Sequence, residues 1–338
     1  MEKLEPILKT LRRELEDGRY AHLAHFPSEY ELSERFGVNK KTANKAVSLL
    51  VAGGLLVRGT RGQGTRVVSG LLFHREQIAF IGELTSPYYA NVFHGIQNAA
   101  MNRRYLVTYL SPSGWVADVL KMLSHSPVKG IVTHAYGRLE TAGVPVVYID
   151  HELQAGEQDL HTISCNNYQG GYEIMREVIA RGHRDIVIYF HPALMRERLT
   201  GFYRAMSEAG IEDCEERTFY SMEHSDFDAK SALKRIQRKY PHFTALATGS
   251  DNDLLRMAKA MSGAGIVWSG RKALTGFGNV TGIGDTLPVA TVDQHPFRIG
   301  CRAAEILIDM MENGEPEQPV RDMLDVEILY PHHIPVLR

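Results

Sequence analysis

The sequence has few cysteines and no segment of the kind that crosses a membrane. Its three cysteines, Cys165, Cys214 and Cys301, lie far apart and form no CxxC pair, so we expect neither a disulfide framework nor a zinc site. No run of 18 apolar residues occurs, and the charged N-terminal segment lacks the apolar region of a signal peptide. We therefore expect a cytoplasmic protein without membrane contacts.

Motifs of common enzyme classes are missing as well. The chain has no GxSxG nucleophile motif and no GxxxxGK[ST] phosphate loop, and its GFGNVTGIG segment does not fit GxGxxG. Its 15 histidines are scattered without the spacing of metal ligands. We expect no catalytic activity, no cofactor and no bound metal.

Acidic residues are absent from one long stretch. Between Arg35 and Arg75 the chain has eight lysines and arginines but no aspartate or glutamate. Residues 1–70 hold 12 Lys and Arg against 8 Asp and Glu, whereas the remainder holds 26 against 32. A basic N-terminal part is typical of a surface that binds a polyanion, although a solvated basic face is the alternative. The acidic remainder would repel DNA and therefore has another task.

The apolar spacing predicts a helix over residues 39–52 with a basic outer face. Its inward positions recur at i, i+3, i+4 and i+7, and they are Ala43, Ala46, Val47 and Leu50. The opposite face carries cations and an amide but no carboxylate, at Lys41, Asn44, Lys45 and Ser48, with Lys40 in the first turn. Such a face suits the major groove of DNA.

The flanking segments complete a small DNA-binding pattern. Ser28 and Glu31 have the spacing of a capping box at the start of a short helix, which Gly37 ends with a tight turn. Residues 55–57 and 66–68 predict two strands of a hairpin around the basic, glycine-rich tip RGTRGQG. An N-terminal helix with apolar residues on one face closes the predicted three-helix core.

Residues 1–68 resemble the winged-helix head of GntR-type regulators through FPSEYELSERFGVNKKTANKAVSLLVAGGLLVRGTRGQGTRV. In that family the start of the second motif helix and the wing tip touch DNA. The resemblance therefore implies a DNA-binding set of Ser28, Lys40, Lys41, Thr42, Asn44, Lys45, Arg58, Arg61, Gly62, Gln63 and Gly64. Lys40 and Asn44 stand where the family commonly has arginines. Lysine lacks the planar fork of arginine, so we expect a different base preference or more phosphate contacts.

Residues 69–76 look like a linker, and residues 77–338 alternate apolar strand patterns with helical ones. Uniformly apolar strands between helices predict parallel sheets that are covered on both faces, and the length allows two lobes. The expected fold class is α/β, a winged helix-turn-helix followed by two doubly wound lobes. The predicted strands are 77–83, 105–110, 130–133, 144–149, 185–190, 245–248 and 273–277. A ligand would bind between the lobes, beyond the carboxyl ends of the strands.

Several segments after residue 77 resemble the effector domain of LacI/GalR-type regulators, whose fold is shared with periplasmic sugar-binding proteins. The segments are IAFIGELTSPYYANVFHGIQNAA, IARGHRDIVIYFHPALMRERLTGFYRAMSEAGI, FTALATGSDNDLLRMAKAM, ALTGFGN and LPVATVDQHPFRIGCRAAEIL. Joined to a GntR-type head, this domain resembles the arabinose-repressor type of transcriptional regulator. The resemblance implies a homodimer or larger oligomer that binds operator DNA and responds to a small molecule.

The resemblance also implies positions near the effector: Ser86, Tyr88, Tyr89, His134, Asp150, Arg198, Asp251, Asn279, Asp293 and Gln294. Each of the main candidates has a structural alternative. Tyr88 and Tyr89 can pack the hinge, and Asp150 and Asp251 can cap helices. Arg198 matches the arginine that typically holds the effector in this family, but a surface ion pair with Glu197 or Glu208 is its alternative.

Two departures from the family pattern affect the expected ligand. Where many relatives have GFDD this chain has GFGN, ending at Asn279, and CNN at residues 165–167 stands where VDN is usual. Two acceptor-only groups are therefore lost, and asparagine can both donate and accept. We expect a sugar as effector, with a nucleoside or purine as the alternative. A solute-binding transport receptor is a less favoured function, and a hydrolase or kinase lacks its catalytic residues.

Overall fold

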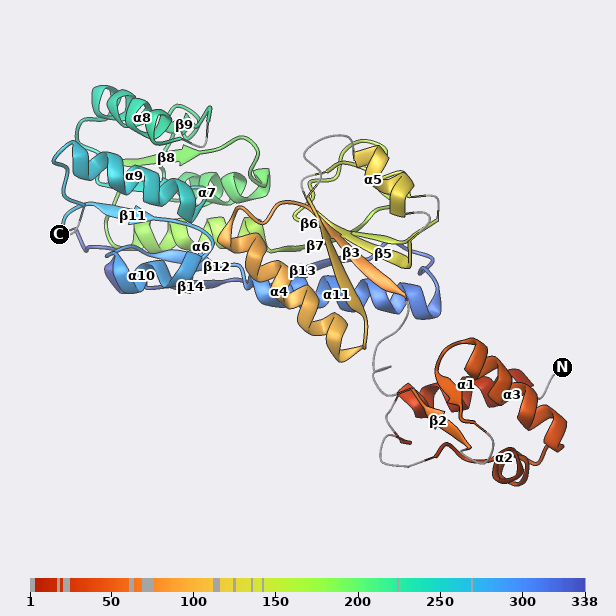
Figure 1. Cartoon of the computed structure of the whole chain (residues 1–338). Helices are drawn as coiled ribbons and strands as arrows, with labels where there is room; N and C mark the ends of the chain where they lie inside the picture. Colours follow the sequence, from red (N-terminus) through yellow and green to blue (C-terminus); the bar gives the residue numbers. More distant parts are fainter. Residues whose placement is uncertain are drawn as a thin grey trace. The chain divides into compact units, whose positions relative to one another are not determined.

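The computed structural model describes residues 4–16, 19–20, 25–60, 64–68, 76–111, 116–123, 126–134, 136–141, 143–223, 225–268 and 270–337 (Figure 1). The chain divides into two compact units, which we describe separately. The head lies within Met1–Arg75, and the body comprises Glu76–Arg103 and Val107–Arg338. Within the described residues, no helix is both long and apolar enough to cross a membrane.

The head is a winged helix-turn-helix. Its elements are α1 (Leu4–Glu16), α2 (Glu29–Phe36), α3 (Lys40–Ala52), β1 (Leu56–Arg58) and β2 (Thr65–Val67). The predicted inward stripe of α3 is buried, and it packs on Leu11 of α1 and Leu32 of α2. Both halves of the capping box at Ser28 and Glu31 are present, and Gly37 adopts the left-handed conformation at φ 60° that ends α2.

The first lobe of the body contains a six-stranded sheet in the order β13-β7-β6-β5-β3-β4, and its described pairings are parallel. Its elements are β3 (Gln77–Ile81), α4 (Pro87–Asn102), β4 (Leu106–Leu110), α5 (Val116–Leu123), β5 (Val128–Thr133), β6 (Val146–Ile149), β7 (His161–Cys165), α11 (Pro296–Asn313) and β13 (Arg321–Leu324). Gly130 of β5 faces Leu307 of α11, whereas Ile131, its neighbour in the strand, faces α5. Helices α11 and α5 therefore cover opposite faces of this sheet (Figure 1).

The second lobe contains a four-stranded parallel sheet in the order β11-β10-β8-β9. Its elements are α6 (Asn167–Ala180), β8 (Ile186–Phe190), α7 (Arg196–Glu208), β9 (Thr218–Tyr220), α8 (Asp226–Lys239), β10 (Ala245–Thr248), α9 (Asp251–Gly263), β11 (Ala273–Thr275), η1 (Val280–Gly282), α10 (Ile283–Thr286), β12 (Thr291–Asp293), β14 (Glu327–Leu329) and η2 (Pro331–His333). Apolar residues of α8 and α9 form one core with β8, β10 and β11.

The chain passes between the lobes three times, after β7, after β12 and between β13 and β14. Two of these crossings are joined by a hydrogen bond from the backbone N–H of Asn166 to the carbonyl of Leu324, at 2.8 Å. The amide of Gln294, on the remaining crossing, donates to the sulfur of Cys165 at 3.3 Å. Hydrogen bonds therefore connect the three crossings to one another.

The sequence-based strand prediction is confirmed for the core strands but needs correction at the edges. Residues 106–110 form an edge strand rather than a buried one, because Leu106 and Tyr109 remain 44% and 38% exposed. Strands β7, β9, β12, β13 and β14 were not predicted. Their segments are short or alternate exposed and covered positions, so they lack the continuous apolar run that marks a buried strand.

Candidate functional site

The first candidate site is the outer face of α3 in the head. Lys40, Lys41, Asn44 and Lys45 are exposed there, as the spacing predicts. Asn39 caps the helix, since its side-chain oxygen accepts from the Thr42 backbone N–H at 2.8 Å and from the Thr42 hydroxyl at 2.9 Å. The first turn is therefore fixed in position, with its cations free to extend into solvent.

The hairpin supplies part of the predicted wing. Strands β1 and β2 pair antiparallel, and the backbone N–H of Gly59 donates to the carbonyl of Gly64 at 2.8 Å. Gly64 has a φ of 63°, a conformation that side chains rarely adopt. The predicted contacts at Arg61, Gly62 and Gln63 lie outside the described residues. Ser28 uses its hydroxyl in the capping box, so that group already has intramolecular partners.

A carboxylate lies beside the outer face of α3, although the sequence of α3 contains no acidic residue and predicts a face without one. Glu29, the first residue of α2, accepts from the side-chain amide of Asn44 at 3.2 Å. The same oxygen lies 3.8 Å from the guanidinium of Arg58, which donates to the Ser48 hydroxyl at 2.9 Å. Periodicity within α3 could not reveal Glu29, because this acid comes from the neighbouring helix.

A second ionic cluster holds α1 against α2. The Glu14 carboxylate accepts from Arg35, from Arg19 and from the hydroxyl of Tyr20. These partners, chiefly Arg35, lower the pKa of Glu14 to about 2. Glu14 is 8% exposed. Arg35, counted among the basic residues of the head, therefore has a structural partner and fixes the base of the helix-turn-helix.

The second candidate site lies where the two lobes of the body meet. Asp150 directly follows β6 of the first lobe, Arg198 lies in the first turn of α7 in the second lobe, and Gln294 lies on a crossing between them. The charges of Asp150 and Arg198 each affect the pKa of the other. These residues, separated by up to 144 positions in sequence, therefore share one electrostatic environment.

Arg198 is a buried cation held by neutral groups. Only 4% of it is exposed, so the alternative of a surface ion pair is wrong. Its Nε and Nη2 donate to the side-chain oxygen of Asn167 at 3.1 and 2.7 Å, and its Nη1 donates to the carbonyl of Gly249. The guanidinium carbon lies 3.6 Å from the centre of the Phe277 ring, the geometry of a cation–π contact.

Two glycines allow α6 and α7 to approach closely enough to place Arg198. A Cβ at Gly171 of α6 would collide with the backbone oxygen of Arg198, and one at Gly201 of α7 would collide with the backbone oxygen of Tyr168. The two helices therefore cross with their backbones in contact. This crossing sets where the Arg198 side chain starts and lets it reach Asn167.

Tyr88 and Tyr89 lie at the start of α4, which Ser86 caps by accepting from the Tyr88 backbone N–H at 3.3 Å. The Tyr89 ring stacks on His134, with ring centres 3.5 Å apart and planes at 11°. His134 is 3% exposed, and its Nε2 contacts the backbone of Glu83. Burial lowers the pKa of His134 to about 4, so the ring is neutral at pH 7. His134 supports one face of Tyr89.

Asp150 occupies an unusual backbone position at φ 51°. Residues 151–160 contain no helix, so the alternative of helix capping is wrong for Asp150. Burial raises the pKa of Asp150 to about 6, against the opposing effects of the Tyr88 hydroxyl and the Arg198 charge. Burial, followed by the Asp150 charge, raises the pKa of Tyr88 well above its usual value.

Asp251 is the first residue of α9, where Ser250 provides the cap. The Asp251 carboxylate accepts from the Thr291 hydroxyl at 2.7 Å and from the Val280 backbone N–H at 2.9 Å. Burial raises the pKa of Asp251 to about 6, and these hydrogen bonds oppose the rise. The carboxylate therefore joins three segments of the second lobe and already has partners.

The segment after β11 and the crossing after β12 contact each other. The Asn279 amide donates to Asp293 at 3.1 Å, and the other Asp293 oxygen accepts from the His295 backbone N–H at 2.7 Å. Asn279 has a φ of 49° and His295 a φ of 52°. Gln294 is 6% exposed and contacts Cys165. Residues at a crossing between the lobes, such as Asp293 and Gln294, therefore belong to the candidate site.

Four buried polar atoms of this site have no hydrogen-bond partner among the described residues. They are Tyr88 Oη, His134 Nδ1, Asp150 Oδ1 and Asn279 Oδ1; the Tyr88 hydroxyl is near enough to Asp150 to affect its pKa but does not reach hydrogen-bond geometry. Burying a polar group without a partner costs on the order of 1–3 kcal/mol, so such atoms mark a place where a ligand or water completes the bonding. Each of the four belongs to a residue that sequence analysis named.

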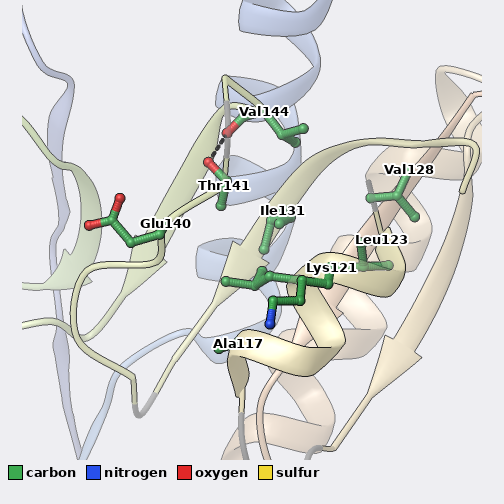
Figure 2. A pocket seen from close by; sticks show the side chains of 9 residues that line it. Ala117, Lys121, Leu123, Val128, Ile131, Glu140, Thr141 and Val144 are labelled. Carbon is green, nitrogen blue, oxygen red and sulfur yellow. Dashed lines mark hydrogen bonds between the residues drawn. The ribbon is translucent and has the colours of Figure 1, made fainter. Parts of the chain in front are cut away.

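A separate cavity of about 320 Å³ lies in the first lobe beneath α5 (Figure 2). Leu120 and Leu123 of α5 face Ile131 of β5 and Val144 across it, and the cavity contains none of the site residues above. Thr141 at its edge donates to the carbonyl of Val144 at 2.7 Å. This cavity was not predicted from the sequence. Across the described ranges, no group of three metal-ligating side chains is placed to hold an ion.

Two family models match the chain. Residues 4–67 match the bacterial regulatory proteins of the gntR family, and residues 175–328 match a periplasmic binding protein-like domain. The HTH-type transcriptional repressor PurR of Aliivibrio salmonicida is 25% identical over 258 residues, covering 70% of this chain and 75% of the relative. The HTH-type transcriptional regulator CelR of Thermobifida fusca is 27% identical over 259 residues, covering 72% and 75%.

Solved structures show the same fold. The transcriptional regulator CelR in a cellobiose complex superposes with a TM-score of 0.67 at 20% identity, covering 90% of this chain and 98% of the other. The transcription regulator CcpA of Lactococcus lactis gives 0.66 at 21%, covering 75% and 98%. Together, these findings define a ligand-controlled DNA-binding transcriptional regulator of the repressor type. The chain therefore combines a head that matches the gntR family model with a body part that matches the periplasmic binding protein-like model.

Proposed function

We propose that the chain is a cytoplasmic repressor without enzymatic activity whose operator affinity is set by a sugar bound between the two lobes. The observation that carries the ligand site is the set of four buried, unpartnered polar atoms, of which those of Tyr88 and Asp150 belong to residues that interact electrostatically with Arg198. Hydroxyl groups suit them, because a hydroxyl can donate to Asp150 and Asn279 and accept from Tyr88. Two solved structures with the same fold hold sugars, cellobiose in one and ribose in the other.

A nucleoside or purine is the second candidate. Tyr89 of the first lobe and Phe277 of the second lobe bring aromatic rings to the residues of this site, through their contacts with His134 and Arg198, and the Asn279 amide can pair with an edge that both donates and accepts. A planar base would stack on the aromatic rings, whereas the hydroxyl groups of a sugar would form hydrogen bonds with the unpartnered polar atoms. The proposed effector set is Ser86, Tyr88, Tyr89, His134, Asp150, Arg198, Asp251, Asn279, Asp293 and Gln294.

The proposed DNA-binding set is Ser28, Lys40, Lys41, Thr42, Asn44, Lys45, Arg58, Arg61, Gly62, Gln63 and Gly64. The exposed cations of α3 support it, since duplex DNA binds through phosphate contacts as well as base edges. The corresponding domain division is a head of residues 1–68, a linker of residues 69–76 and an effector domain of residues 77–338.

The repressor acts in this proposal as a homodimer or larger assembly on a roughly palindromic operator. Exposed apolar side chains in the second lobe support self-association, with Met222 and Phe227 at 77% and 79% exposed. Ligand closes the lobes about the three crossings and changes the spacing of two heads. Half-sites must lie a helical turn or a multiple apart, so a small rotation suffices. A coupling free energy of about 1–3 kcal/mol would account for the switch.

A thermal-shift screen of sugars and nucleosides on the full chain tests the ligand class. A compound at 100 times its dissociation constant stabilises the native state by about 2.7 kcal/mol. Hits confined to sugars support the first candidate, and hits confined to nucleosides or purines support the second. A screen in which no sugar, nucleoside or purine shifts the melting temperature would contradict both.

A further inference from the structure

We infer that Asn44 is an adenine-reading residue of the head and that Glu29 and Ser48 are positioning residues that fix the orientation of its amide. The inference rests on the proposed DNA-binding role of α3. Its basis is a chain of hydrogen bonds across three elements, from Arg58 in β1 through Ser48 and Asn44 in α3 to Glu29 in α2.

The direction of this hydrogen-bond chain follows from the chemistry of its ends. Arg58 can only donate, and it contacts the Ser48 hydroxyl at 2.9 Å. That hydroxyl therefore accepts from Arg58 and turns its single proton toward the Asn44 side-chain oxygen, at 3.4 Å. An ionised Glu29 can only accept, so it takes an N–H from Asn44 at 3.2 Å.

The reverse orientation of the Asn44 amide is disfavoured chiefly at the Glu29 end. Its oxygen would face the Glu29 carboxylate, two acceptors with no proton between them, and the Ser48 hydroxyl would have to turn its proton away from Asn44. The charges of Arg58 and Glu29, 3.8 Å apart, strengthen the arrangement from both ends. Because Asn44 is exposed on α3, its orientation is set by these neighbours rather than by core packing.

The fixed amide keeps one N–H and one oxygen lone pair for another partner. This is the pair of groups that an asparagine uses to contact N7 and the N6 amino group of adenine in the major groove. Guanine offers two acceptors on the same edge and would leave the amide oxygen without a donor. A preorganised Asn44 therefore selects adenine at one position of each half-site.

The test compares base preferences of full-length variants by selection from a randomised duplex library, followed by binding to single-base substitutions of the selected site. We expect wild type to prefer adenine at one position of each half-site. Asn44→Ala should lose this preference, by roughly 5- to 150-fold, while the other positions keep theirs. Glu29→Gln and Ser48→Ala should weaken the preference at that same position, and Ser48→Thr, which keeps the hydroxyl, should retain it.

Glu34→Gln provides the matched control, because it removes the same charge from an exposed position of α2. It should leave all base preferences unchanged. If Glu29→Gln alters a position different from that altered by Asn44→Ala, Glu29 reads a base itself and the positioning role is wrong. If Asn44→Ala changes no position, the inference fails while DNA binding stands. If wild type selects no sequence at all, the proposed DNA-binding role fails first.

Discussion

The guanidinium of Arg198 lies over the ring of Phe277, 3.6 Å from its centre, and no carboxylate forms a salt bridge with it among the described residues. Burying a cation is costly unless it is well supported, and here the support comes from a ring and two neutral oxygens. Arg198 is therefore kept charged at a place where its remaining N–H groups are available to a ligand.

Replacing Arg198 with Ala should abolish the response to ligand while sparing DNA binding in its absence. We expect the ligand dissociation constant to rise by on the order of 100-fold, because truncating a buried charged partner costs about 2–5 kcal/mol. Calorimetric titration of the ligand identified in the screen measures this change. Arg204→Ala is the control on the same helix, since its exposed pair with Glu208 contributes little. Unchanged ligand affinity in Arg198→Ala would show that Arg198 does not hold the effector.

Lys45→Ala should weaken DNA binding and lower its dependence on salt. A phosphate contact releases counterions, so the slope of log affinity against log salt should decrease by about 0.9. Binding titrations at four salt concentrations measure the slope. Lys234→Ala removes the same charge from an exposed position of α8 in the acidic body and should change neither affinity nor slope. An unaltered slope in Lys45→Ala would place this residue outside the phosphate contacts.

Gly171→Ala should separate α6 from α7 and displace Arg198. The added methyl group meets the backbone oxygen of Arg198, which cannot move independently of α7. We expect a loss of about 1–3 kcal/mol in the free energy of unfolding, together with weaker ligand binding. Chemical denaturation and ligand titration measure the two effects.

Gly263→Ala, at the end of α9, is the matched control because a methyl group there meets open space. Alanine favours helix over glycine, so stability should stay equal or rise by up to about 1 kcal/mol. If Gly171→Ala is as harmless as Gly263→Ala, the close crossing of α6 and α7 does not position Arg198.

Ligand affinity should increase between pH 5 and pH 7. The pKa of Asp150 is raised to about 6, so roughly one-tenth of this carboxyl is ionised at pH 5 and roughly nine-tenths at pH 7. A hydroxyl donor binds the ionised form, so the affinity gain should approach about tenfold. Asp150→Asn should remove this dependence, although Asp251, whose pKa is also about 6, remains. If ligand affinity depends on pH in Asp150→Asn as it does in wild type, a group other than Asp150 takes up the proton.

The free energy of unfolding of the ligand-free body should decrease as the pH rises, whereas ligand affinity increases. The native pKa of Asp150 lies above the value of 3.8 expected for the unfolded chain, so the native state binds the proton more tightly. Its contribution to stability is therefore greatest below pH 3.8 and is lost as the pH rises through about 6. Ligand-free unfolding measured across this range separates the effect on folding from the effect on binding.

Sequence patterns predicted the parts of this protein that depend on local periodicity. The buried stripe of α3, the capping box of α2 and the core strand β10 follow from spacing and residue type alone. Strands β13 and β14 were not predicted because their residues alternate or stay half-exposed at the edges of sheets. Their pairing depends on partners far away in the chain, such as β7 and β12.

The candidate effector residues were named by resemblance, but their states depend on the assembled fold. Nothing near Asp251 in sequence indicates that Thr291 and Val280 satisfy its carboxylate, whereas Asp150 keeps an unpartnered oxygen. Glu29 was missed for the same reason, because its contact with Asn44 joins two helices. Resemblance and spacing therefore named the candidate residues, and long-range contacts decide which of their polar groups already have partners.

The central claim is that ligand at the junction of the lobes changes the DNA affinity of the head. Operator binding by the full-length protein, titrated at fixed low salt with and without saturating ligand from the screen, measures this coupling directly. We predict tight, salt-dependent binding whose dissociation constant shifts by about 5- to 150-fold with ligand, and no shift in Arg198→Ala. Equal operator affinity with and without a ligand that demonstrably binds wild type would contradict the account.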